Sequence, residues 1–209
     1  MFDEYFDYGD ENGVYLLSGN INMNIEFALA SVKSITSEPE YDKKLFCNRF
    51  VYYFFHLQSL FTACGNINST FYNFSFLKGV DPQTKRYDRT LYQNQNSDYQ
   101  RLRDIYHIDK EHFPLVFNKD FRNTIIHSDE RIMEHSANVG DYNILDHHTP
   151  DSIVSTILNT PHLRTLDLRT MTYHSYNKQK SHISVNLLDL QDELENIKIN
   201  LIKYSPFKK

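Results

Sequence analysis

Residues 45–61 read LFCNRFVYYFFHLQSLF, and their pattern is the main constraint on the fold. Large apolar residues recur there at spacings of three and four, which is the period of an α-helix. The resulting apolar face is wider than contact with one neighbour requires. The pattern therefore predicts a helix buried on more than one side, either inside the core or with one side against a second subunit. The residues of this face are Leu45, Phe46, Phe50, Val51, Tyr53, Phe54, Leu57, Leu60 and Phe61.

Capping residues predict where this helix begins and ends. Ser37-Glu38-Pro39-Glu40 combines a cap, a proline in the first turn and a glutamate at the third position, which is typical of a helix start. Gly65-Asn66 predicts the end of the helix, near Ala63. An earlier helix is predicted from Asn20 to Ser37, because apolar residues recur there at helical spacing: Ile21, Ile25, Ala28, Leu29, Val32 and Ile35.

The middle of the chain has weaker periodicity. Residues 66–96 are rich in Asn, Gln and Tyr, and we interpret them as a long irregular insertion. Ser97 with Gln100 predicts the start of a short helix. The next helix is expected to begin just after Pro114 and to continue to about Asn138. Residues 141–165 are predicted to be mostly loop, with a short helix at 152–158.

Between residues 165 and 187 the apolar period changes from helical to alternating, which predicts a small β-hairpin around a turn at 177–180. Asn186 is predicted to cap a C-terminal helix. The expected fold class is mainly α, a helical bundle with the hairpin before its last helix. We expect one domain over residues 1–209, with the insertion at about 66–96. The apolar face of the last helix comprises Leu190, Leu194, Ile197 and Leu201.

The composition indicates a globular protein and limits its partners. The chain has 209 residues, is 40% hydrophobic and carries a formal net charge of -5, so the whole protein is not a basic nucleic-acid binder. Cys47 and Cys64 are too far apart for a Cys-x-x-Cys motif and too few for a disulfide framework, which favours buried thiols in the cytoplasm. Neither a signal peptide nor a membrane-spanning apolar run is present, so no membrane partner is expected.

Residues 121–129 read FRNTIIHSD and place polar side chains in an otherwise apolar helical segment. Asn123 and His127 are four residues apart and share one helix face. Arg122 lies about 100° from Asn123, and its long side chain reaches back toward the pair. A guanidinium binds phosphate oxygens and an imidazole exchanges protons near neutral pH, so these three residues suit metal-free phosphate chemistry. Two residues are expected to face the core on the opposite side, Phe121 and Ile125.

This segment resembles the defining pattern of the HEPN superfamily (higher eukaryotes and prokaryotes nucleotide-binding). That pattern is an arginine, a polar residue, three more residues and a histidine on a late helix of a small α-helical bundle. Arg122-Asn123-Thr124-Ile125-Ile126-His127 matches it, with Asn in the polar position. The predicted order of two long helices, the motif, a hairpin and a closing helix is similar to that of some prokaryotic members.

The resemblance implies a metal-independent endoribonuclease of the toxin-antitoxin or anti-phage abortive-infection type, with no cofactor. In that chemistry a 2'-hydroxyl attacks the adjacent phosphate and leaves a cyclic phosphate and a 5'-hydroxyl. His127 is then the general acid or base, Arg122 stabilises charge on the phosphate oxygens, and Asn123 orients His127 or the phosphate. The resemblance also implies a homodimer in which two motifs meet one RNA, and a protein partner such as an antitoxin.

One position departs from the family pattern. HEPN toxins controlled by a nucleotidyltransferase often carry a tyrosine two residues after the histidine, whereas this chain has Asp129 there. That difference puts control by adenylylation in doubt. The alternative function is a non-catalytic HEPN-like module that binds a nucleotide or a protein and uses the helices for assembly. An accidental resemblance in an unrelated helical domain is the third interpretation.

Local basic residues are candidates for RNA contact. Two lie close to the motif, where they counter the charge of Asp129 and Glu130. The others interleave with tyrosines in a composition that can hold single-stranded RNA, although the same composition fits an ordinary polar insertion. The candidates are Lys119, Arg131, Arg86, Arg89, Arg101 and Arg103.

The remaining histidines carry weaker signals. His107 and His112 either join the motif or lie at helix ends. His147-His148 falls in a predicted loop without further ligands at metal spacing, so no metal site is expected. His174 and His182 belong to the predicted hairpin and are expected to face each other across its strands.

Overall fold

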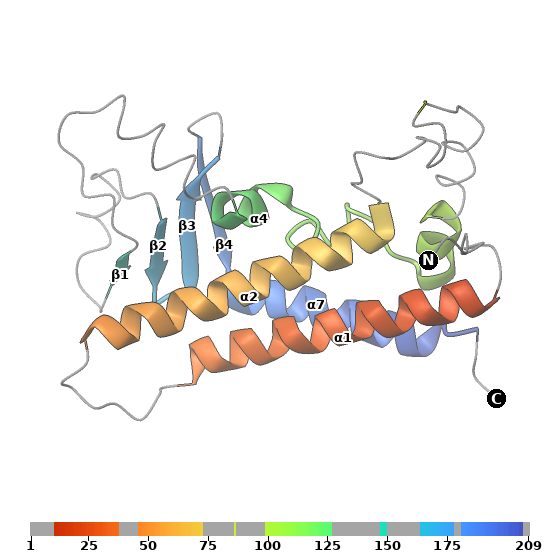
Figure 1. Cartoon of the computed structure of the whole chain (residues 1–209), viewed down its shortest axis with the longest axis horizontal. Helices are drawn as coiled ribbons and strands as arrows, with labels where there is room; N and C mark the ends of the chain where they lie inside the picture. Colours follow the sequence, from red (N-terminus) through yellow and green to blue (C-terminus); the bar gives the residue numbers. More distant parts are fainter. Residues whose placement is uncertain are drawn as a thin grey trace.

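The computed structural model of the chain describes residues 11–37, 46–72, 86, 99–126, 147–149, 164–177 and 181–206. These residues are mainly helical, and a small sheet precedes the C-terminal helix (Figure 1). The mainly α class predicted from the sequence is therefore confirmed. Among the described helices, none is long and apolar enough to span a bilayer.

Helix α1 spans Glu11–Thr36 and buries the apolar stripe that its sequence predicts. It begins earlier than the predicted Asn20, because Val14 also lies in the core and Ser18 forms a hydrogen bond with the hydroxyl of Tyr106. The stripe residues that are at most 1% exposed are Ile21, Ile25, Ala28, Val32 and Ile35.

Helix α2 spans Phe46–Tyr72 and is buried on two sides, as its wide apolar face predicts. Helix α1 runs along one side of it (Figure 1). On another side, the ring of Phe61 lies 5.7 Å from that of Phe121 and 5.1 Å from that of Tyr173, measured between centroids. The second partner is thus a later part of the same chain.

The predicted helix end at Gly65-Asn66 is wrong, because α2 continues to Tyr72. A glycine inside a helix costs about 1 kcal/mol relative to alanine. Ile67 and Phe71 beyond it are fully buried, and burying each such side chain contributes about 1.5 to 3 kcal/mol. Residues 66–72, which were predicted to belong to an irregular insertion, are therefore helical. Arg86 apart, residues 73–96 lie outside the described residues, as do most of the predicted caps at 37–40.

Residues 99–106 form a helix that ends at His107. The φ angle of His107 is 51°, the left-handed conformation that commonly follows the last turn of a helix. Ser97, the predicted cap, lies outside the described residues. The apolar spacing predicts one face made of Leu102, Ile105 and Tyr106; this helix buries Leu102 and Tyr106, and Ile105 is half-buried.

Helix α4 spans Lys119–Ile126, so it begins later than the predicted start just after Pro114. The side-chain oxygen of Asn118 accepts a hydrogen bond from the backbone N–H of Asp120 at 2.9 Å, as a helix cap does. The rest of the predicted helix, from residue 127 to about Asn138, lies outside the part of the chain that the structure describes.

The late start of α4 has a long-range cause in the C-terminal helix α7, which spans Leu187–Lys203. The carboxylate of Glu193 accepts hydrogen bonds from the backbone N–H groups of Leu115 and Val116, each at 2.9 Å. Residues 114–117 form turns, and these two bonds hold them there. In a helix, the same N–H groups would point along the helix axis. One side chain of α7 thereby sets where α4 begins.

The described strands form one four-stranded sheet in the order β1-β2-β3-β4. Strands β2 (Arg164–Asp167), β3 (Thr172–Tyr176) and β4 (His182–Asn186) are antiparallel, and β1 (His147–Thr149) pairs with β2 in parallel. The core row of the three antiparallel strands, paired in register, is Leu166, Tyr173 and Val185.

The predicted hairpin has one strand too few. Its first half contains two strands, β2 and β3, where the sequence predicts one. Strand β2 ends at Asp167, whose carboxylate accepts hydrogen bonds from the Arg169 N–H at 2.9 Å and the Thr170 hydroxyl at 2.7 Å. These bonds close a turn that leads into β3. The loop predicted for residues 141–165 is also wrong at His147-His148, which lie in β1; the short helix predicted at 152–158 lies outside the described residues.

The prediction for the C-terminal helix is confirmed. The side-chain oxygen of Asn186 accepts hydrogen bonds from the N–H groups of Leu188 and Asp189, so Asn186 caps α7. Its amide also donates to the carbonyl oxygen of Thr170 at 2.9 Å, which ties the cap to the β2–β3 turn. All four predicted apolar residues are buried: Leu190, Leu194, Ile197 and Leu201.

Replacing Glu193 should destabilise the turn before α4. Glu193→Ala leaves the N–H groups of Leu115 and Val116 without their acceptor, which should lower the free energy of unfolding by about 2 kcal/mol in urea titrations. Glu193→Gln keeps an oxygen acceptor and should lose less. Equal losses in the two variants would contradict the role assigned to this carboxylate.

The stability of the protein should also depend on pH through Glu193. Burial raises the pKa of Glu193 above its ordinary value of 4.5, despite the bonds from Val116 and Leu115 that lower it. The stability linked to its protonation is therefore fully present below the unfolded pKa and is lost as pH rises through the folded pKa. Relative to Glu193→Gln, the wild type should lose stability as pH rises above 4.5. A constant difference between the two proteins would contradict this sign.

Candidate functional site

Helix α4 lies with its apolar side against α2 and the sheet, as the spacing of its residues predicts. Phe121 and Ile125 are 3% and 5% exposed, and Thr124 between them is also buried. Arg122 and Asn123 are half-buried on the remaining side of the helix. The first half of the predicted motif is therefore oriented as expected.

The side chain of Arg122 crosses α2 directly above Gly65. A Cβ atom at Gly65 would lie only 2.2 Å from Cδ and 2.6 Å from Nε of Arg122, which is far closer than atoms can approach. Glycine at this position thus makes room for the arginine. The sequence prediction had assigned Gly65 to a helix end and missed this role.

The Nε atom of Arg122 is buried, and no hydrogen-bond acceptor meets it among the described residues. A buried donor without an acceptor costs free energy, and more so when it belongs to a charged group. An anionic oxygen bound at this guanidinium would supply that acceptor through a charge-assisted bond. The local geometry therefore suits Arg122 to hold a phosphate or carboxylate.

The other members of the motif are only partly described. Asn123 is half-buried beside Arg122, at a position on the side of α4 opposite the core residues. His127 lies just beyond the last described residue of α4, and so do Asp129 and Arg131. The proximity of Arg122 to the imidazole of His127 therefore stays a prediction.

The predicted RNA-binding residues separate into different groups. Lys119 and Arg101 are exposed, as is Arg86, while Arg89 falls outside the described residues. Arg103 is half-buried and holds the end of α2: Nη1 donates to the carbonyl oxygen of Phe71 at 2.6 Å, and Nη2 donates to Gln100. Arg103 therefore has a structural role at a helix C-terminus, where a cation is favourable.

Tyr72 and Lys110 are two more functional candidates, which the sequence prediction missed, and they lie at the same end of α2. The Arg103 guanidinium is 4.5 Å from the ring centroid of Tyr72, and the ammonium of Lys110 is 4.1 Å from it. Burial lowers the pKa of Lys110, and the nearby charges of Lys119 and Arg103 lower it further. Two cations therefore lie against one aromatic ring. In the sequence, the only signal for this group is the seven-residue spacing of Gly65 and Tyr72, which puts both residues on one face of α2.

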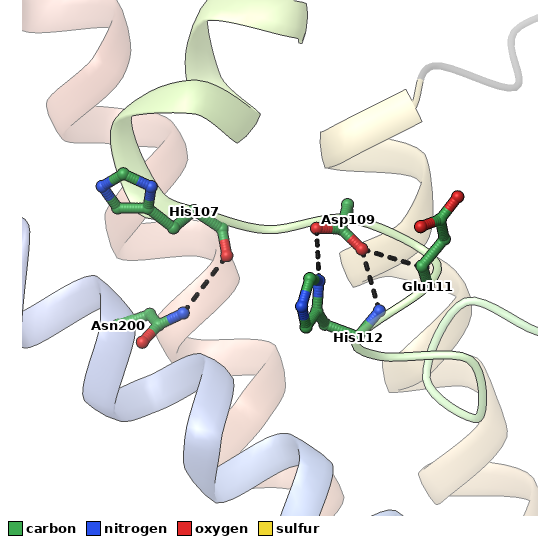
Figure 2. Close-up of polar contacts among 5 residues, drawn as sticks. All are labelled: His107, Asp109, Glu111, His112 and Asn200. Carbon is green, nitrogen blue, oxygen red and sulfur yellow. Dashed lines mark hydrogen bonds and ion pairs between the residues drawn. The ribbon is translucent and has the colours of Figure 1, made fainter.

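A cavity of about 740 Å³ opens beside Tyr72, lined also by residues from the helix at 99–106, the following turn and α7. His107 and His112 lie here, so they do not join the motif on α4. The imidazole of His112 is 2.7 Å from the carboxylate of Asp109, and Asn200 donates to the carbonyl oxygen of His107 at 3.3 Å (Figure 2). The cavity wall thus combines amide, imidazole and carboxylate groups.

The remaining titratable residues form no metal site within the described part of the chain, where no three His, Cys, Asp or Glu side chains converge. His174 and His182 stack across β3 and β4 with nitrogen atoms 3.2 Å apart, so the predicted cross-strand pair is confirmed. Burial raises the pKa of the Cys64 thiol to about 12, which keeps it protonated.

Comparison of the chain with protein-family models, with curated proteins and with solved structures found no match.

Substituting Gly65 tests the placement of Arg122, and the chain offers a matched control. Gly19 also lies inside a helix, but a Cβ there would meet no atom within 4 Å. Gly19→Ala should raise the free energy of unfolding by about 1 kcal/mol through helix propensity. Gly65→Ala should forfeit that gain, because the new methyl group displaces the arginine.

The Nε–H signal of Arg122 in a nitrogen-proton correlation spectrum provides the direct readout. The signal should be protected from solvent exchange in the wild type and in Gly19→Ala, and should lose that protection in Gly65→Ala. An equal gain in stability for both variants, with the signal unchanged, would show that Arg122 does not depend on Gly65.

Proposed function

We propose that this protein is a metal-independent endoribonuclease of the HEPN-like type. The observation that carries the proposal is the placement of Arg122, which lies across Gly65 with a buried Nε–H that lacks an acceptor in the described residues. A guanidinium in this state gains a hydrogen bond when a phosphate oxygen binds. The Arg-Asn-x-x-x-His pattern of residues 122–127 supports the same chemistry.

The proposed reaction needs only groups that the motif and solvent water supply. The 2'-hydroxyl of one nucleotide attacks the adjacent phosphorus and loses its proton, while the bond from phosphorus to the 5'-oxygen breaks and that oxygen gains a proton. His127 carries one of these protons, and a water molecule carries the other. Arg122 stabilises the charge that develops on the non-bridging oxygens, and Asn123 orients His127 or the phosphate. The products are a cyclic phosphate and a 5'-hydroxyl.

The proposal includes a homodimer that presents two copies of the motif to one RNA. It also includes a cellular role as a toxin or an anti-phage effector, with an antitoxin or another protein as partner. Both parts rest on the resemblance of residues 122–127 to the HEPN pattern.

A non-catalytic HEPN-like module is the second candidate, and one observation favours it. Arg122 is half-buried and packs on Gly65, so its side chain also holds α4 against α2. An arginine used in this way stabilises the bundle without touching a substrate. The two candidates differ in what they require of His127, since only the nuclease needs its imidazole.

Incubation of mixed-sequence RNA with the protein in EDTA tests the proposal. The wild type should cut RNA to products that end in cyclic phosphate. His127→Ala should reduce the rate by about a hundredfold to ten-thousandfold, the usual contribution of a general acid or base. Arg122→Lys keeps the charge without the planar fork of donors and should also be impaired.

Gly19→Ala serves as the folded control and should cut RNA as the wild type does, because its Cβ meets no neighbouring atom. Absence of cleavage by a folded wild-type protein would favour the non-catalytic module. Full activity in His127→Ala would exclude the proposed proton transfer.

A further inference from the structure

Helices α1 and α2 lie side by side and share an apolar groove (Figure 1). The groove has a volume of about 530 Å³, and all of its lining residues belong to these two helices. Two exposed phenylalanines line it, Phe27 of α1 and Phe55 of α2. We call this side of the pair the α1–α2 face. Six of the other lining residues have small side chains: Ala30, Ser31, Ser34, Ser59, Thr62 and Ala63.

Exposed apolar residues of α1 continue this face beyond the groove. Leu16, Met23 and Phe27 are each at least 49% exposed, and their spacings of seven and four put them on one side of the helix. Together with Phe55, they are four of the eight large apolar side chains that are exposed in the described chain. Large apolar side chains gathered on one surface indicate a contact with another molecule.

Charged residues avoid the α1–α2 face. Residues 50–72 of α2 contain no Asp, Glu, Lys or Arg, although these residues make up 23% of the chain. Residues 16–34 of α1 contain only Glu26 and Lys33. Glu26 forms an ion pair with α7, and Lys33 borders a separate cavity that α1 shares with α7. Burial lowers the pKa of His56, which lines the groove, below its ordinary value of 6.5, so this imidazole is neutral at pH 7.

Many polar groups of the groove are already hydrogen-bonded within the helix pair. The hydroxyl groups of Ser31, Ser34 and Ser59 each donate to the backbone carbonyl oxygen four residues earlier, at 2.9 to 3.0 Å. The amide of Asn66 donates to the side-chain oxygen of Asn24 at 3.0 Å, from α2 to α1. These groups keep their partners when water is displaced, so another protein surface can cover the groove without leaving them unsatisfied.

The shape and charge of this face match a second copy of the same chain. A two-fold interface pairs one patch with itself, so the patch must contain both protruding and receiving parts. The face has both, since Phe27 and Phe55 protrude beside a groove with room for more than one ring, each of which needs about 150 Å³. Two copies with a net charge of -5 can meet here because the face is neutral, whereas an anionic membrane or a charged peptide would find no opposite charge.

The size of the face also fits a dimer. Residues 16–34 span about 27 Å of helix and two adjacent helices are about 20 Å wide, which gives roughly 540 Å² in projection. The accessible area is larger because side chains protrude from this plane. A standard interface buries about 800 Å² on each partner, so the α1–α2 face is of the required order.

We propose that two copies of the chain pair through their α1–α2 faces, with the Phe27 and Phe55 rings of each copy in the groove of the other. Gly65 lies three residues beyond Thr62, on the neighbouring side of α2, so Arg122 lies at the edge of this face. Pairing through it brings both copies of Arg122 to one interface. The inference rests on the proposed function for the purpose of the dimer, and the structure adds the surface that forms it.

Sedimentation equilibrium of the full chain tests the interface. The wild type should be a dimer at micromolar concentration. The double variant Phe27→Glu, Phe55→Glu should raise the dimer Kd about a hundredfold or more, because its carboxylates would be buried without partners. Both side chains are exposed in one copy, so the variant should fold. Thr62→Arg places a charge at the groove from another exposed position and should also weaken the dimer.

The matched control is Ile199→Glu, Ile202→Glu. These isoleucines of α7 are 55% and 57% exposed, much as the phenylalanines are, but lie outside the face. The control should keep the wild-type Kd, and circular dichroism should show that all variants are folded. A monomeric wild type, an unchanged Kd in the phenylalanine variant and Thr62→Arg, or an equal loss in the control would each overturn the inference.

Charge reversal tests whether the face binds a copy of itself. The double variant Phe27→Lys, Phe55→Lys should also be monomeric alone. Mixing it with Phe27→Glu, Phe55→Glu should restore a dimer, because opposite charges then meet across the interface. Failure of the two variants to pair would contradict contact between the two faces.

Cleavage of RNA in EDTA separates this inference from the proposed function. If the wild type cuts RNA as a monomer, the interface is wrong and the nuclease stands. If the wild type dimerises through this face but leaves RNA uncut, the interface stands and the nuclease is wrong. If both proposals hold, the monomeric phenylalanine variant should cut RNA more slowly than the control.

Discussion

The burial of α2 on two sides is the constraint on which the rest of the structure depends. One side packs along α1, and another receives α4 and β3 through the ring of Phe61. Aromatic side chains of this size bury enough apolar area to outweigh the cost of a glycine within the helix. The continuous helix that results carries Gly65, against which Arg122 lies, and Tyr72, against which Arg103 and Lys110 lie.

The position of α4 depends on contacts that are distant in sequence. Glu193 from the last helix holds the turn before α4, and Asn68 of α2 donates to the carbonyl oxygen of Phe117 at 3.0 Å. These bonds place Arg122 over the one residue of α2 that has no Cβ to obstruct it. The candidate site is therefore built on packed helices, which position side chains more precisely than loops do.

The electrostatics of the chain are local. The net charge of -5 disfavours general attraction of nucleic acid. Two cations nevertheless share the ring of Tyr72 at the end of α2: Arg103 lies 4.5 Å and Lys110 lies 4.1 Å from its centroid. Burial lowers the pKa of Lys110, and the charges of Lys119 and Arg103 lower it further.

The sequence by itself determined the features that depend on neighbouring residues. Apolar spacing predicted α1, α7 and the buried side of α4, and Asn186 predicted a cap, because helix periods and caps are set within one or two turns. The tertiary structure alone decided the rest. Gly65 lies inside α2 because distant residues pack beyond it, α4 begins late because Glu193 reaches its turn, and Arg103 caps α2 from another helix. Each of these depends on a partner far along the chain, and no local pattern in the sequence identifies such a partner.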